Sequence, residues 1–136
     1  MATLTLRLTI PDPVPGVHYF LQGKDNAPVG TVVAGTAPLS FDIPVTLSAD
    51  GRLTGPFVRR EGKERRFVYI ATHGGAGAPT DGQGRTISRR AKIDIHDIPA
   101  ALRKDGAILA VTLPGRDAKG LPSCATVRPI DAWRAV

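Results

Sequence analysis

The residues with the clearest potential for chemistry form a glycine-rich stretch, HGGAGAPTDGQG, at residues 73–84. Backbone amides in such a stretch can hold the phosphates of a nucleotide when a lysine and then a serine or threonine follow the second glycine. Gly77 and Gly82 have the spacing of that motif, but a glutamine and a glycine stand where the lysine and the hydroxyl belong. The dinucleotide-binding pattern also fails, because the stretch does not open a helix-forming segment. We therefore predict no cofactor here.

Two segments of strand-like composition flank this stretch, RRFVYIAT at residues 65–72 and TISRRAKIDI at residues 86–95. The second alternates apolar and polar side chains, which is typical of a half-buried strand. We predict that the two segments pair side by side, joined by a loop of about a dozen residues. Paired strands would bring the cations of both segments and of the preceding turn onto one surface: Arg59, Arg60, Lys63, Arg65, Arg66, Arg85, Arg89, Arg90 and Lys92.

Such a basic surface has two interpretations. Its positive potential would attract phosphates, carboxylates or an acidic partner protein. In the simpler interpretation, the charges only solvate the surface and are partly matched by Glu61, Glu64 and Asp94. Nucleic acid is a disfavoured partner, because only Phe67 and Tyr69 could stack on bases and no nucleic-acid-binding motif accompanies the charge.

Two arginines are notable for their positions in strands. Arg89 falls on the apolar face of its strand, beside Ala91, and Arg128 ends a strand next to a proline. A buried guanidinium needs a carboxylate or several carbonyls as partners, and Asp131 and Asp42 are the carboxylates considered for that role. A structural ion pair and an anion-binding pocket both remain open. The candidate anion-binding residues are Arg66, His73, Arg85, Arg89, Arg90 and Arg128.

Catalytic and metal sites have little support in the sequence. The chain has three histidines: His18, His73 and His96. None has a partner at the spacing that helical metal sites use, so no metal site is predicted. Three side chains were considered as nucleophiles: Ser88, Ser123 and Cys124. No local motif of a serine or cysteine enzyme surrounds them, so no catalytic residue is assigned. The alternative to a binding function is an enzyme with a pocket near His73, Arg89 and Arg90.

Short strands separated by turns account for most of the chain. Residues 3–10 and 39–48 alternate apolar and polar side chains, and Pro44 lies on the polar face of the second segment. Because proline has no N–H to donate, that segment is predicted to be an edge strand, through which a homodimer could form. About eight or nine strands of this kind predict an all-β antiparallel sandwich or a partly open barrel. One short helix is predicted at residues 97–105, with Asp97 as its cap.

The length of 136 residues fits a single domain that spans residues 1–136. The net charge is +6 at pH 7, and the excess lies in the second part of the chain. Residues 1–58 carry three basic and four acidic side chains, a net of −1, whereas residues 59–136 carry fifteen and eight, a net of +7. A single cysteine excludes an internal disulfide. The absence of a secretory leader and of a long apolar run predicts a soluble, cytoplasmic protein.

Four blocks of the sequence carry a resemblance to a known family: PDPVPGV, GPFVRREGKERRFVYI, ISRRAKIDI and PSCATVRPIDAWR. In the order and wording of these blocks the chain resembles a family of small bacterial proteins catalogued as domain of unknown function 5990. The resemblance implies a compact, mostly β bacterial domain, and it assigns no catalytic residues. We therefore expect a non-enzymatic binding or accessory domain whose basic face meets an acidic partner or a small anion.

Overall fold

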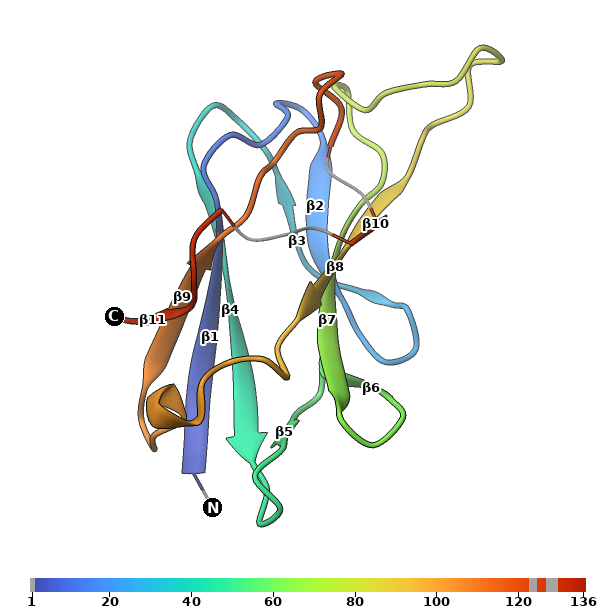
Figure 1. The fold of residues 1–136 in the computed structure, drawn as a ribbon. Coiled ribbons are helices and arrows are strands. Elements are labelled where there is room, and N and C mark those ends of the chain that lie inside the picture. Colours follow the sequence, from blue (N-terminus) through green and yellow to red (C-terminus); the bar gives the residue numbers. More distant parts are fainter. Residues whose placement is uncertain (1, 123–124, 127–129) are drawn as a thin grey trace.

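The computed structural model describes residues 2–122, 125–126 and 130–136, and its strands form two sheets (Figure 1). In the first sheet the strands follow one another in this order: β11 (Arg134–Ala135), β9 (Ile108–Thr112), β1 (Ala2–Ile10), β4 (Leu39–Leu47) and β5 (Leu53–Thr54). The order in the second sheet is β10 (Ala125–Thr126), β8 (Arg89–Asp94), β7 (Arg65–Thr72), β2 (His18–Gln22) and β3 (Pro28–Val33), with β6 (Arg59–Glu61) paired to β7.

Both sheets are mainly antiparallel, and each contains one parallel pairing among the described residues, β1 with β9 and β8 with β10. Apart from β6, which branches off at β7, the strand order runs from one edge of each sheet to the other, so the sheets do not close into one barrel in the described part of the chain. This confirms the all-β prediction and selects the sandwich over the barrel. More strands are described than were expected because β5, β10 and β11 are only two residues long.

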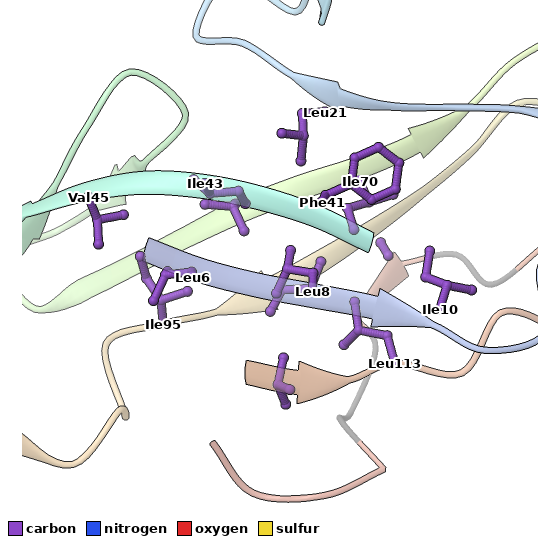
Figure 2. Packing of buried hydrophobic residues seen from close by; sticks show 14 of the residues in the cluster. Leu6, Leu8, Ile10, Leu21, Phe41, Ile43, Val45, Ile70, Ile95 and Leu113 are labelled. Atoms are coloured by element: carbon purple, nitrogen blue, oxygen red, sulfur yellow. The ribbon is translucent and has the colours of Figure 1, made fainter. Parts of the chain in front are cut away.

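The core lies between the two sheets and follows the alternation of the sequence. In β1, the side chains of Leu4, Leu6, Leu8 and Ile10 are all buried, while the threonines and the arginine between them are not. β4 contributes its own alternate residues to the same layer, and β7 and β8 contribute theirs from the opposite sheet. Figure 2 shows these side chains meeting between the ribbons. Each fully buried leucine or isoleucine stabilises the fold by about 1.5–3 kcal/mol.

The helix expected at residues 97–105 is a single 3-10 turn, Ala100–Leu102, in the structure. Pro99, and not Asp97, is the N-cap residue, and no side chain caps the turn. The segment is held short at both ends, because Ile98 is buried in the core and Gly106 already donates its N–H to the Thr3 carbonyl of β1. No helix within the described residues has the length and apolar character needed to cross a membrane.

Strand β4 is the second strand of its sheet from one edge and not the edge strand that the proline predicted, because the short strand β5 pairs with its last residues. It pairs with β1 over its whole length, but on its other side β5 pairs only with Thr46 and Leu47. Pro44 is opposite Thr5, whose N–H points away from β4 to the Ala107 carbonyl. The pair Thr5–Pro44 is therefore of the non-hydrogen-bonded kind. The backbone nitrogen of Pro44, which has no hydrogen to donate, accordingly faces the side of β4 away from β1. A homodimer through this edge stays a prediction.

Candidate anion-binding groove

The two arginine-rich segments lie side by side as antiparallel strands, β7 and β8, as the sequence predicted. Their register runs from Phe67 opposite Asp94 to Thr72 opposite Arg89. The connecting loop, residues 73–88, extends away from the two sheets (Figure 1). Isoleucine 87 lies in this loop and not in β8, so the strand is shorter than the segment predicted at 86–95.

Glycines in this loop serve close packing of the backbone. The root of the loop contacts the turn before β2, where Gly77 donates its N–H to the Gly16 carbonyl. A Cβ atom on Gly77 would lie 1.9 Å from the Pro15 carbonyl oxygen, so only glycine fits there. At the tip, Asp81 accepts hydrogen bonds from the backbone N–H groups of Gln83 and Arg85. Close packing of the backbone therefore explains the glycine at position 77.

The cations that the sequence placed on one surface lie in several places. Arg85 forms an ion pair with Asp81 at the loop tip, 2.8 Å from Nε to Oδ2. On the outer face of β7 and β8, the Arg90 guanidinium lies 4.0 Å from the ring centre of Tyr69. Lys92 lies over Phe67 and also pairs with Glu61, which in turn pairs with Arg65. These cations are matched by rings or carboxylates.

Arg89 is half-buried and lies on the same face of β8 as the buried Ala91 and Ile93, as the alternation predicted. Arg128, Ser123 and Cys124 lie outside the described residues. The two carboxylates considered as partners have other contacts: Asp42 pairs with Arg7 across β1 and β4, and Asp131 pairs with Arg134.

A different set of cations lines an open groove of about 440 Å³ between β5, β6 and the β2–β3 turn. Its lining residues are Lys24, Leu53, Thr54, Gly55, Val58, Arg59, Arg60 and Arg66. Four of these side chains are cationic and none is a carboxylate. The groove is therefore a region of positive potential with an apolar floor, and a low-dielectric floor strengthens that potential.

Arg66 is the buried member of this set, with only 7% of its surface exposed. It shares a face of β7 with the core residues Val68 and Ile70, because alternate residues of a strand point to the same side. Its Nη1 donates to the carbonyls of Lys63 and Arg65, each at 3.0 Å. No carboxylate of the described residues forms an ion pair with it. Its guanidinium is thus held in place by carbonyl oxygens.

The other three cations differ in how firmly they are held. Arg59 donates to the Gly23 carbonyl and to the Asn26 side-chain oxygen, and it also lies 5.0 Å from the ring centre of Tyr69. Its buried Nε has no hydrogen-bond partner in the described part of the chain. Lys24 and Arg60 are exposed, and neither forms an ion pair with a described residue. An anion entering the groove would therefore meet one fixed, buried arginine and two exposed cations at the surface.

On the far side of Arg66 lies a smaller polar pocket, whose lining includes His96, Arg103 and two carboxylates, Asp50 and Glu64, that both pair with Arg52. His96 Nδ1 is 3.2 Å from the Arg66 N–H and 3.1 Å from its carbonyl oxygen. Arg103 donates to the carbonyls of His96, Ile98 and Gly51, which ties the turn before β5 to the segment after β8. Both side chains hold the backbone around Arg66.

His73 lies just beyond the end of β7, is exposed, and forms a short hydrogen bond through Nδ1 with the Ser88 hydroxyl. The structure thus joins the exposed histidine to one of the serines considered as a nucleophile. No three histidine, cysteine or carboxylate side chains of the described ranges come together as a metal site.

Sequence reasoning placed Arg66 at the surface and missed the role of Lys24. The apolar run after Arg66, FVYIA, has no visible period of two, so it hides which face of the strand is inward. Lys24 stands in a turn far from the arginines in sequence, and only the hairpin of β2 and β3 brings it to the groove. A strict alternation count from Ile70 backwards through Val68 would have placed Arg66 on the core face.

Comparison with known proteins gives a family and no function. A family model described as "Family of unknown function (DUF5990)" matches residues 4–136. Neither a curated protein nor a solved structure matches the chain.

Proposed function

We propose that this chain, which belongs to the family of unknown function DUF5990, is a binding domain that takes a carboxylate or phosphate group in the groove between β5 and β6. Arg66 supports the proposal most directly. It is an arginine more than nine-tenths buried, its guanidinium is fixed by two carbonyls, and it lines a groove whose lining residues include no carboxylate. Removing such a charge from water is costly unless an opposite charge compensates it.

An anion in the groove would supply that compensation. Arg66 offers a planar set of donors that suits the two oxygens of a carboxylate or phosphate. Lys24 and Arg60 would then close over the ligand from the rim, because their side chains are long and exposed. Exposed cations contribute mainly to the rate of association, which is sensitive to salt.

Titration calorimetry with citrate and with inorganic phosphate tests this function. We expect binding that weakens at least tenfold when Arg60→Gln and Lys24→Gln are combined, since both cations face the groove. Arg85→Gln is the matched control, because Arg85 is paired with Asp81 on a loop tip outside the groove. Arg66→Gln should abolish binding, provided that its thermal unfolding shows a folded protein. Equal loss of affinity in the Arg85 variant would contradict the assignment to the groove.

A second candidate function, an enzyme acting near His73, is favoured by the hydrogen bond between His73 and Ser88. A histidine in contact with a serine hydroxyl can remove its proton and make it a nucleophile. This function predicts that a phosphonylating reagent for serine enzymes labels Ser88 and that His73→Gln abolishes the labelling. Mass spectrometry of the labelled protein would decide the point.

A further inference from the structure

The groove has strand edges as two of its walls, and the hydrogen bonds around them show which backbone groups are available. The carbonyl oxygen of Arg66 accepts a hydrogen bond from the N–H of Ile95, and the N–H of Arg66 donates to His96 Nδ1. Both backbone groups of Arg66 therefore point towards β8. Arg60 is opposite Arg66 in the antiparallel pair of β6 and β7. This pair is therefore of the non-hydrogen-bonded kind, and the N–H and C=O of Arg60 point away from β7.

The same argument applies to β5 on the opposite wall. Ser48 donates its N–H to the Arg52 carbonyl and closes the turn between β4 and β5. The next pair, Leu47 with Leu53, is then non-hydrogen-bonded, so the backbone groups of Leu53 point away from β4. Leu53 and Arg60 both line the groove, and no other described strand pairs with either of them on that side.

We infer that the ligand of the groove is an extended acidic peptide that adds to β6 as a further strand, pairing with the N–H and C=O of Arg60. The inference rests on the proposed function, since it names the ligand of the same groove. An open strand edge recognises a peptide backbone in this way, and pockets for alternate side chains supply the specificity. Acidic residues at every second position of the peptide would face the groove cations, Lys24, Arg60 and Arg66.

The floor of the groove adds an apolar contact for the side chains that enter it. Leu53 and Val58 are buried apolar residues there. Gly55 lies so close to β4 that a Cβ atom on it would be 2.8 Å from the Pro44 carbonyl oxygen. The backbone at Gly55 therefore packs directly against β4. The methylene groups of the acidic side chains would rest on this floor, so glutamate fits better than aspartate, and the residues between them would point to the opposite face of the peptide strand. A free small anion would use the charges but neither the open edge nor the apolar floor.

Three peptides separate strand addition from attraction by charge alone. The parent is an octapeptide of alternating glutamate and valine with an acetylated N-terminus and an amidated C-terminus. One of the other two is N-methylated at every glutamate, and the other is N-methylated at every valine. Backbone N–H groups of a strand point alternately to its two edges, so each methylated form lacks the donors of one edge and keeps its charges. We expect the parent and one methylated form to bind the full-length protein, and the other form to bind at least tenfold more weakly. We also expect the Arg60 amide to exchange with solvent at least tenfold more slowly with the parent peptide, and unchanged with citrate.

The outcomes distinguish this inference from the proposed function. If citrate and all three peptides bind to the groove with no difference between the methylated forms, the anion site stands and strand addition is overturned. Equal weakening of both forms would also overturn pairing through the single edge of β6. If neither citrate nor any peptide binds, the proposed function itself fails.

Discussion

Gly75 lies against Gly16 so closely that a Cβ atom on Gly75 would be 2.1 Å from the Gly16 carbonyl oxygen. The neighbour is backbone and does not move aside, and Gly75 also has φ +100°, a conformation that other residues rarely adopt. This contact joins the root of the β7–β8 loop to the proline-rich turn before β2. It explains why glycine is needed here, although the sequence resembles a phosphate-binding loop.

Gly75→Ala should therefore lower the free energy of unfolding by about 1–3 kcal/mol, the usual cost of forcing atoms into a filled space. Gly82→Ala is the matched control, because Gly82 lies in the same loop with no atom within 4 Å of its added Cβ and without a positive φ. Urea denaturation of the three proteins measures the difference. Equal stability of the two variants would show that the contact does not constrain the loop.

Arg103 connects two separate segments through three carbonyls, those of Gly51, His96 and Ile98. Arg103→Lys should destabilise the protein by about 1–3 kcal/mol, since one ammonium group does not reach three diverging acceptors and leaves some of them unpaired. Lys104→Arg, an exchange at an exposed neighbour that also keeps the charge, is the matched control. Thermal unfolding of both variants provides the comparison, and a control variant as unstable as Arg103→Lys would contradict this role.

Asp42 and Arg7 are opposite each other on β4 and β1, with 2.9 Å between Asp42 Oδ1 and Arg7 Nε. The hydrogen bond from Arg7 lowers the pKa of Asp42 below its ordinary value of 3.8. Stability from this pair is thus present above pH 3.8 and is lost as the pH falls through the lowered pKa. Asp42→Asn should make the fall of unfolding free energy below pH 4 shallower than in the wild type. Urea titrations at several pH values measure that slope, and an unchanged slope would exclude the pair as a contributor.

Tyr19 is buried, and its hydroxyl accepts the Val14 N–H at 2.8 Å. Tyr19→Phe should cost about 1 kcal/mol because the partly buried Val14 N–H loses its acceptor. Burial raises the pKa of Tyr19 above its ordinary value of 10.0. The neutral form is therefore favoured by folding, and the wild type should lose stability as the pH rises through and above 10, relative to the phenylalanine variant. Chemical denaturation of both proteins at pH 8 and at pH 10.5 tests both statements. If the difference in unfolding free energy between the wild type and Tyr19→Phe is the same at both pH values, the predicted loss of stability at high pH is refuted.

The sequence by itself determined the all-β class and the pairing of β7 with β8. Residues 3–10 alternate so regularly that only one face of β1 can be buried, and a period of two fixes that face without knowledge of the partner strands. The prolines and glycines marked the turns, because proline is restricted to few backbone conformations and glycine can adopt many. Pro44 likewise indicated the open side of β4 from the missing N–H alone.

Only the tertiary structure decided which cations share a site. Lys24 and Arg60 are separated by many residues, and they meet because the β2–β3 hairpin and β6 lie at the same border of one sheet. The predicted helix became one 3-10 turn because Ile98 and Gly106 are fixed by the core and by β1. The pattern of apolar and polar residues within a strand indicates which face of that strand is buried. It does not report which elements meet, because that depends on how two sheets pack and where each strand ends.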